Sequence, residues 1–485
     1  MRVLSFFALI ATAALTANAQ TNAPEAVRQI SLEDCIQMVL RQNVDIQIER
    51  SNPQIARFNL RSSYGAYDPT LAFSAERGHS EAGPTLLGTN FISGTVSDGN
   101  SVSSSLDGLL PWGMLYSLRG DANDTDRKTG LGLPIANSSG GVSAGVTQPL
   151  LRNFWIDSTR LTIRFNKNLL TRSEWELKRT IMERITLLEQ AYYDLIFHRE
   201  NVLVQQKAVE LAEQLVTENR KRVEVGAMAP LEAKFADSQA AASRADLIAA
   251  KSNLAVQENI VKQLITANYA EWAGVSLVPS GGLTAPAQVF SLQDSWRKGL
   301  SQRPEMVQAK LDAERAGIQL KFDRNQLFPQ LDLFATYGYN GSGAEFSGTF
   351  YDIEQRNRPF YNYGAQISIP LANIGPRNNY KASKVSLQQA VMVVKRWERD
   401  IMRAIDDDIK VAQASFERVA ATRAAREYTE EALAAEQKKL EQGKSTTYTV
   451  LQIQRDLTQA RGQEIQALDQ YKKNLSQLSF DEGAT

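Results

Sequence analysis

The feature that most constrains the fold is a stretch from Asp157 to Val225 that contains neither proline nor glycine. Apolar residues recur along it in alternating steps of four and three, as at Ile181, Ile185 and Leu188, which is the rhythm of a coiled coil. A helix of about 68 residues is about 100 Å long, whereas globular helices average about 11–12 residues. A compact core cannot cover such a rod, so we expect long helices that pack on one another along their length.

Two glycines end the long helices predicted in the two halves of the chain. Gly226 follows the first stretch directly, and Gly443 follows a second pattern of the same rhythm. Glycine readily accepts the left-handed conformation found just after a helix. Pro230 suits the first turn of a returning helix, and Ser445 or Thr446 can cap the second return. We therefore interpret both glycines as the tips of helical hairpins.

The two halves of the chain repeat one another. A shift of 260 positions places Ser31 on Ser291 and Pro69 on Pro329, and residues 31–78 then show eleven identities, where chance gives about three. The order of predicted elements is also the same: a helix, a strand after a proline, a loop, a second strand, a long helix, a glycine tip and a returning helix. A shared heptad bias alone would not place prolines and glycines alike, so we expect two tandem structural repeats.

The first residues form a separate segment. Arg2 precedes an apolar run from Val3 to Leu15, and an Ala-Asn-Ala triplet ends at Ala19. A positive start, a short apolar core and small residues before a cleavage point are typical of a secretory signal peptide. The run is too short to span a membrane as a helix. We expect an exported protein without a helical membrane anchor.

The expected domain organisation has five parts. They are a signal peptide (1–19), an N-terminal lead (20–30), a first repeat with a helix, a strand pair, a long loop and a long helical hairpin (31–280), a second repeat in the same order (281–480) and a C-terminal tail (481–485).

Four short segments alternate between apolar and polar residues. They are residues 71–75, 142–146, 331–340 and 363–369, with Phe334 as an exception to the pattern. One apolar and one polar side over about ten residues is typical of a strand in an outer-membrane barrel. The edge of a soluble β-sandwich explains any one of these segments equally well.

The number of strands constrains how a membrane barrel can form. Four strands cannot enclose a pore, and eight only just fill their own interior with side chains. Several copies must therefore contribute, and three copies of four strands give twelve with a lumen. The first half has extra length, about residues 79–141, with a further alternating run from Trp112 to Leu118. We interpret it as an additional hairpin or a folded external loop, and its place in the barrel wall stays open.

Together these features resemble the TolC-like outer-membrane efflux duct family. They are the signal peptide, the duplication, the second strand of each half ending in Pro-Leu, at Pro149 and Pro370, and the glycine-broken long helices, and they extend from about Ser31 to Phe480. The resemblance implies a mainly α protein with a small β part. It implies a homotrimeric 12-stranded outer-membrane β-barrel, continued across the periplasm by a coiled-coil barrel of long helices. It also implies a periplasmic adaptor protein and an inner-membrane pump that dock at the helical tips.

The resemblance also directs attention to the residues just after the tip glycines, where the family often carries carboxylates. The matching positions after Gly443 are Thr449 and Gln452, and neither is acidic. In the first half, Glu232 follows Gly226 at the corresponding place. Glu232 forms either a charged ring at the mouth of the duct or a solvated glutamate at a helix start.

Three cations precede the first tip. Arg220, Lys221 and Arg222 lie where they can contact an acidic partner. They also lie where last-turn cations balance the helix dipole, and both interpretations stay open.

Composition excludes several classes of function. Lys+Arg and Asp+Glu are 54 each, so the net charge is zero, which argues against a nucleic-acid binder held by positive charge. One cysteine and two histidines argue against a disulfide framework or a transition-metal site. No phosphate loop or nucleophile elbow occurs in the sequence. We expect no enzyme, no cofactor and no metal.

The leading hypothesis is the outer-membrane channel of a tripartite efflux or type I secretion system, a passive exit duct in the outer membrane with a periplasmic helical extension. A coiled-coil envelope spacer or adhesin-like protein without a pore is the alternative, and a soluble periplasmic enzyme is a third class. The exported substrate and the class of pump cannot be read from the sequence, because walls of ducts are chemically generic.

Overall fold

The computed structural model describes residues 26–87, 90–92, 94–128, 134–226 and 228–485. The predicted signal peptide and residues 20–25 of the predicted lead lie outside them. The chain divides into two compact units, and each combines segments of both halves of the sequence. The first unit contains the described residues up to Asn43, Leu187–Ala287 and Ala414–Lys473, and the second contains Val44–Thr186, Gln288–Gln413 and Asn474–Thr485.

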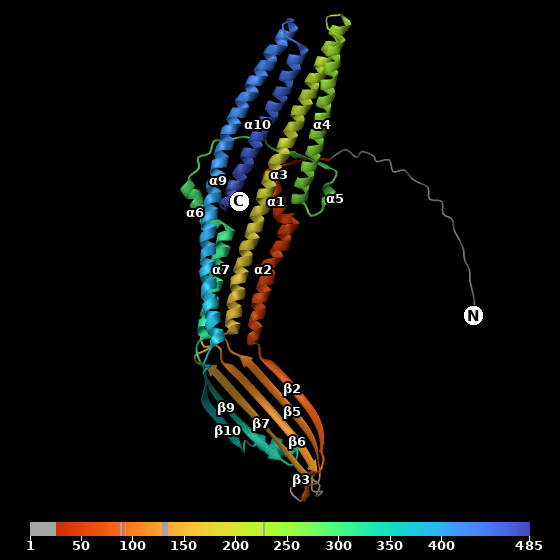
Figure 1. Ribbon diagram of the computed structural model, residues 1–485. Coiled ribbons are helices and arrows are strands. Elements are labelled where there is room, and N and C mark those ends of the chain that lie inside the picture. Colours follow the sequence, from red (N-terminus) through yellow and green to blue (C-terminus); the bar gives the residue numbers. More distant parts are fainter. Residues whose placement is uncertain (1–25, 88–89, 93, 129–133, 227) are drawn as a thin grey trace, which may run out of the picture. The chain divides into compact units, whose positions relative to one another are not determined.

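Helices make up most of the chain (Figure 1). The α-helices are α1 (Leu32–Gln42), α2 (Val44–Ser63), α3 (Ser158–Glu224), α4 (Pro230–Ile265), α5 (Tyr269–Trp272), α6 (Leu292–Gln302), α7 (Pro304–Asn325), α8 (Phe346–Glu354), α9 (Ile374–Glu441) and α10 (Thr447–Asp481). A short 3-10 helix, η1, spans Tyr64–Tyr67.

Six of the ten strands in the described part of the chain lie in one sheet (Figure 1). The ten strands are β1 (Ala26–Ile30), β2 (Thr70–Ala82), β3 (Thr85–Leu87), β4 (Asn90–Ile92), β5 (Thr95–Leu109), β6 (Leu115–Lys128), β7 (Pro134–Pro149), β8 (Val275–Pro279), β9 (Gln330–Gly343) and β10 (Pro359–Ser368).

The predicted long helices are confirmed. The stretch without proline and glycine is α3, with 67 residues, and its counterpart α9 has 68. The returning helices α4 and α10 have 36 and 35 residues. The helix predicted at the start of each half, before the first strand, is interrupted once, at Asn43 in the first half and at Arg303 in the second, where the backbone is extended. At the second break Pro304 begins α7, since proline disfavours helical geometry in the residue before it.

The first unit is held by helix packing and a small parallel sheet. β1 pairs with β8 in parallel, which ties the N-terminal lead to the segment after α5. The Tyr192 hydroxyl of α3 contacts the carbonyl oxygens of Ile30 and Ser280, each at 3.1 Å. The predicted lead at residues 20–30 is therefore a structural element from Ala26 onward.

The second unit contains a six-stranded antiparallel sheet in the order β10-β9-β7-β6-β5-β2. The sheet has two strands more than the four alternating segments of the sequence. The count of twelve strands in three copies stays a prediction. The extra length in the first half forms β5 and β6, which lie between β2 and β7 in the middle of the sheet (Figure 1). The alternating run that begins at Trp112 belongs to β6 and to the turn before it.

An apolar core joins the helices of the second unit. It contains Met306, Ile401, Ile405, Ile409 and Leu478, all buried, from α7, α9 and α10. Trp296 of α6 packs against this core and donates a hydrogen bond to the Met402 carbonyl at 2.9 Å. Within the described part of the chain, no helix combines the length and the apolar composition needed to cross a bilayer.

Candidate functional site

The six-stranded sheet has one apolar face and one polar face. Side chains alternate between the faces along a strand, and residues paired across strands share a face. The pairing register therefore places one row of side chains on the same face across all strands. This row is Leu71, Leu106, Leu118, Ala144, Tyr337 and Tyr361.

The apolar face is open to its surroundings in the single chain. Its side chains are 75% exposed at Leu71, 71% at Phe73 and 76% at Tyr363. The apolar rows extend from Leu331 to Tyr339 along β9, which is about 27 Å of strand. With the usual tilt of barrel strands this gives a band about 20 Å tall, close to the apolar band of outer-membrane barrels.

Exposed aromatic residues lie at both ends of the apolar face. At the end of the sheet next to the helices, Trp112 is 56% exposed and Trp155 is 75% exposed. At the other end α8 packs on β9, and it presents exposed Phe350 and Tyr351. A β-carbon on Gly341 would touch α8, so α8 lies on the apolar face. Aromatic residues at both borders of an apolar band are typical of membrane–water interfaces.

The opposite face carries hydroxyl, amide and charged groups. Its members include Ser103 and Ser105 on β5, Arg119 on β6, Ser143 on β7, Thr336 on β9 and Gln366 on β10. Phe334, the exception noted in the sequence, is paired with Gly364, and its ring covers that glycine so closely that a β-carbon there would come within 2.9 Å. The exception thus fills a gap in an otherwise polar wall.

Both edges of the sheet are open, and each continues into a helix with an exposed apolar stripe. The edge strand β2 follows α2, whose Ile48 and Phe58 are 61% and 62% exposed. The edge strand β10 precedes α9, whose Val385 and Met392 are 62% and 68% exposed. Unpaired edges and apolar stripes are both unfavourable in water, so the second unit presents two incomplete sides.

The tip glycines have the backbone that the sequence predicts. Gly226 has φ +72° and Gly443 has φ +70°, the left-handed conformation that favours glycine. After α9, the Lys444 amide donates to the Lys439 carbonyl at 2.8 Å and the Gly443 amide donates to the Leu440 carbonyl at 3.1 Å. These two bonds form a Schellman motif, which terminates the helix at the tip.

The returning helices also begin as predicted. Pro230 is the first residue of α4, where its missing amide hydrogen costs no helical bond. At α10, Thr446 rather than Ser445 is the capping residue, since its hydroxyl accepts from the Thr449 amide at 3.4 Å and lies 2.9 Å from the Thr449 hydroxyl. Ser445 instead donates to the Glu436 carboxylate at 2.5 Å.

The two hairpins pack together near their tips. Their common core consists of buried Ala212, Leu215, Val216, Ala236, Ala240, Leu433, Leu440, Val450, Leu451 and Leu457. The ring centroids of Phe235 and Tyr448 are 5.8 Å apart. The structure thus brings the two predicted tips into one four-helix assembly.

The residues predicted to line the mouth differ in their surroundings. Glu232 is exposed in the first turn of α4, and Gln452 is exposed on α10. Thr449 is half-buried and is bonded to the helix cap. Among the described residues, therefore, Glu232 and Gln452 present free surface near the tips, while Thr449 belongs to the cap.

The three cations before the first tip separate in the structure. Arg220 donates to Asp237 of the same hairpin at 2.8 Å, Lys221 is exposed, and Arg222 is half-buried in a shallow pocket with Glu218 and Glu441. Arg220 therefore links α3 to α4, and Lys221 presents an exposed charge.

Two buried polar side chains near the tips are not predicted from the sequence. Asn219 and Thr447 are 0% and 2% exposed, and within the described part of the chain neither the Asn219 amide nor the Thr447 hydroxyl has a hydrogen-bond partner. A buried polar group without a partner costs about 1–3 kcal/mol. The packing at the tips is therefore less stable than a wholly apolar core would be.

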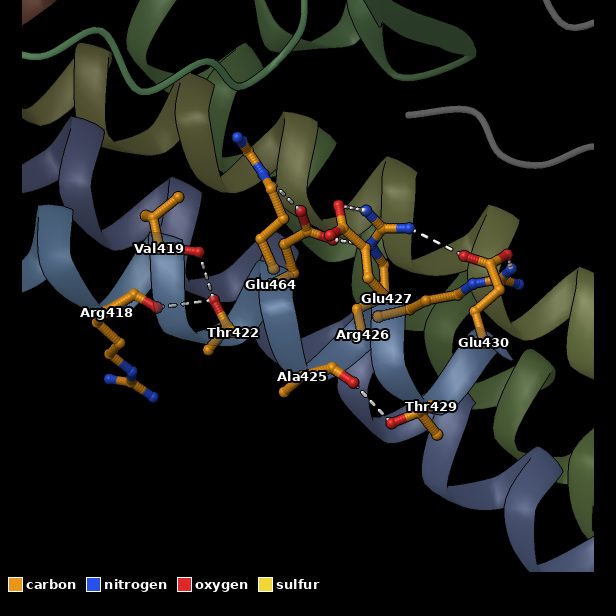
Figure 2. Close-up of polar contacts among 11 residues, drawn as sticks. Arg418, Val419, Thr422, Ala425, Arg426, Glu427, Thr429, Glu430 and Glu464 are labelled. Carbon is orange, nitrogen blue, oxygen red and sulfur yellow. Dashed lines mark hydrogen bonds and ion pairs between the residues drawn. The ribbon is translucent and has the colours of Figure 1, made fainter. Parts of the chain in front are cut away.

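A network of ion pairs joins α9 to α10 below the second tip. Arg426 of α9 lies 2.6 Å from Glu464 of α10 and 2.9 Å from Glu430 of its own helix (Figure 2). Arg461 reaches Glu430 at 2.6 Å and Arg423 reaches Glu464 at 3.3 Å. Isolated exposed pairs contribute little, but a network of this kind fixes the register of the returning helix.

Two carboxylates in the helices, half-buried Asp408 and buried Asp469, have raised pKa values. Burial and the neighbouring Asp481 raise the pKa of Asp408 to about 8, while Arg303 holds Asp481 at 2.7 Å. Burial likewise raises the pKa of Asp469 to about 7, although Lys473 lies 3.7 Å away and opposes the shift. The acidic run at 406–408 is thus partly buried, and one of its members belongs to a carboxylate pair.

The remaining reactive group is the single cysteine. Cys35 is fully buried in α1, and burial raises the pKa of its thiol to about 12, which makes it unreactive. In the part of the chain that the structure describes, no group of His, Cys, Asp and Glu side chains is arranged to hold a metal ion.

Comparison with known proteins gives a family match for part of the chain and a similar fold for most of it. Residues 297–480 match the family model described as outer membrane efflux protein. Among solved structures, the Campylobacter jejuni CmeC outer membrane channel is 14% identical, with a TM-score of 0.67 over 93% of this chain and 85% of CmeC. The Vibrio cholerae outer membrane protein VceC is 16% identical, with a TM-score of 0.68 over 93% of this chain and 96% of VceC.

A third solved structure is the open state of the Neisseria gonorrhoeae MtrE outer membrane channel. It is 16% identical, with a TM-score of 0.63 over 93% of this chain and 88% of MtrE. Comparison with curated proteins gives no significant match.

Proposed function

We infer that this chain, whose residues 297–480 match the outer membrane efflux protein family and whose fold is that of outer-membrane channels, is the outer-membrane exit duct of an efflux system. The observation that carries the proposal is the six-stranded sheet with one apolar and one polar face. Such a sheet is suited to lipid on one side and to water on the other.

The duct is passive. The polar face offers hydroxyl and amide groups, such as those of Ser103, Ser105 and Thr336, to hydrated cargo. We assign no catalytic residue, cofactor or metal to the chain, so the work of export comes from a partner. The signal peptide predicted at residues 1–19 directs the chain out of the cytoplasm, and the sheet then inserts in the outer membrane.

Three copies of the chain form the duct, as in the family that the sequence resembles. A single six-stranded sheet cannot enclose a lumen. When copies meet head to tail around an axis, the open edge at β10 of one copy pairs with the open edge at β2 of the next. The apolar stripes on α9 and α2 then cover one another. An even number of antiparallel strands in each copy keeps the alternation of strand direction across that joint.

The helical tips are the periplasmic end, where we propose that an adaptor protein and an inner-membrane pump dock. Lys221, exposed Val225 and exposed Leu231 supply a charged and apolar surface there. Opening moves the tip hairpins from their present packing, and the unpaired Asn219 and Thr447 lower the stability of that packing. The two-repeat organisation, 31–280 and 281–480, gives each copy two equivalent hairpins.

Disulfide crosslinking tests this proposal without interference from the buried Cys35. Cysteines introduced at Gln452 in each copy, near the mouth, are expected to block export when oxidised and to release it when reduced. As a matched control, a cysteine introduced in each copy at exposed Arg399 on α9, away from the tips, should leave export unchanged. Export that continues with crosslinked tips would contradict gating at this end.

A coiled-coil spacer without a pore is the alternative function. It accounts for α3 and α9 and gives no role to a sheet with two chemically different faces. Ion conductance of the purified protein in a planar bilayer separates the two: the duct conducts and the spacer does not.

A further inference from the structure

The hairpin formed by β5 and β6 has no counterpart in the second half of the chain, where β9 and β10 are joined directly through α8. We propose that this hairpin is part of the barrel wall, so that three copies close a barrel of eighteen strands. The inference rests on the three-copy duct proposed above and goes beyond it, because it sets the width of the lumen and the size of cargo that the outer-membrane part admits.

The length and pairing of the hairpin match those of a wall. β5 has 15 residues and β6 has 14, compared with 13 in β2 and 16 in β7. A strand needs about 9–11 residues to cross a bilayer. β5 pairs with β2 along all of β2, and β6 pairs with β7 from Leu115 to Lys128, so the hairpin joins β2 to the rest of the sheet.

The side chains of the hairpin follow the two faces. Leu106 and Leu118 continue the apolar row from Leu71 to Ala144, while Ser105 and Arg119 lie on the polar face. Beyond the apolar rows the same strand positions become charged, with Asp98 on β5 and Asp124 and Asp126 on β6. A loop outside the membrane has no reason to carry an apolar row in register with its neighbours.

The position of the turn gives a second, independent argument. Residues 110–113 turn at the end of the sheet where the helices begin, held by hydrogen bonds between Leu110 and Met114 and between Gly113 and Leu110, both 2.8 Å. Gly113 has φ +91°, and a β-carbon there would lie 2.7 Å from the guanidinium of Arg160 on α3. An external loop would turn at the far end of the sheet, whereas this hairpin runs the whole height and is anchored at the base.

The consequence is a wider duct. Three copies of a six-stranded sheet make eighteen strands, and the diameter of a barrel grows roughly in proportion to the number of strands. The barrel is then about one and a half times as wide as one of twelve strands, in the range where porins keep an open aqueous channel. Its wall is lined by small polar groups on β5 and β7, so we assign bulky hydrated polar solutes as the cargo that this part passes.

Labelling of single cysteines in reconstituted full-length protein tests the proposal. Leu106→Cys is expected to carry a fluorophore that brominated lipid quenches, and Ser105→Cys is expected to react with a membrane-impermeant maleimide and to escape quenching. Val142→Cys and Ser143→Cys on β7 are the matched reference pair, since β7 is in the wall under the proposed function whether or not the hairpin is.

The outcomes separate the two proposals. Quenching at both Leu106 and Val142, with eighteen strands in an electron-microscopy map of the three-copy complex, supports the wide barrel. Quenching at Val142 without quenching at Leu106, or a map with twelve strands, overturns it and leaves the duct intact. Absence of quenching at Val142 as well refutes the lipid-facing sheet and the proposed function with it.

Discussion

A charge placed on the apolar face of the sheet shows which side faces lipid. Leu118 lies on β6 in the row shared by Leu106 and Ala144, and its neighbour Ser117 lies on the opposite face. The informative pair of variants is Leu118→Arg and Ser117→Arg. They differ by one position along the same strand and introduce the same side chain.

The expected cost follows from the depth of the residue. Leu118 lies within the apolar rows, where an arginine facing lipid near the bilayer midplane costs about 2–4 kcal/mol. Three copies place three such charges in one barrel, which amounts to about 6–12 kcal/mol if the sites act independently. A typical protein has a stability of about 5–15 kcal/mol, so folded Leu118→Arg complex should not accumulate.

The control variant should behave differently. Arg119, the next residue after Leu118, already lies on the polar face, so that side of β6 accommodates arginine. We expect Ser117→Arg to change stability by no more than about 0.5 kcal/mol, as for most surface substitutions.

The assay is the amount of folded complex in the outer-membrane fraction, followed by urea unfolding of whatever complex is reconstituted in vesicles. Leu118→Arg should give little or no complex, and Ser117→Arg should match the parent protein. Equal tolerance of the two variants, or loss of complex with Ser117→Arg alone, would refute the assignment of the apolar face to lipid.

Four further substitutions test the helices by thermal or urea unfolding. Gly443→Ala should destabilise the tip by about 1–2 kcal/mol because Gly443 has a left-handed backbone. Gly462→Ala inside α10, where a β-carbon meets no neighbour, should instead stabilise the protein by up to about 1 kcal/mol. Equal effects of the two substitutions would argue against the tip geometry. Asn219→Leu should stabilise the packing at the tips by removing a buried unpaired amide, and a loss of stability would mean that this amide has a partner. Asp408 has a pKa of about 8 in the folded protein, so the stability contributed by its protonated form is lost as pH rises from about 4 to 8. The stability of Asp408→Asn relative to the parent protein should therefore increase with rising pH. A constant difference in stability across pH 5–9 would contradict the raised pKa.

Much of the helical part could be predicted from the sequence because its signals are local. The absence of proline and glycine defines α3, and the tip glycines take the backbone that a helix end requires. Pro230 starts α4 because its ring fixes φ near the helical value and its missing amide hydrogen is not needed at that position. Such features depend on neighbours within one or two turns, so no knowledge of tertiary contacts is needed.

The strand count could not be predicted in the same way. β5 consists largely of serine, glycine and aspartate, and Ser104 occupies a position of the apolar face. The alternation of apolar and polar residues along β5 is therefore weak. Its place in the sheet comes from pairing with β2 and β6, which are contacts between segments rather than properties of the segment. The same holds for Asp408, whose pKa is raised by burial and by Asp481, a residue far away in the sequence.

The mass of the complex extracted by mild detergent from the outer-membrane fraction tests the central claim most directly. A lumen in this account exists only when the open edges at β2 and β10 meet between copies. The account predicts a complex of three chains. A single chain that remains in the water-soluble fraction would contradict it.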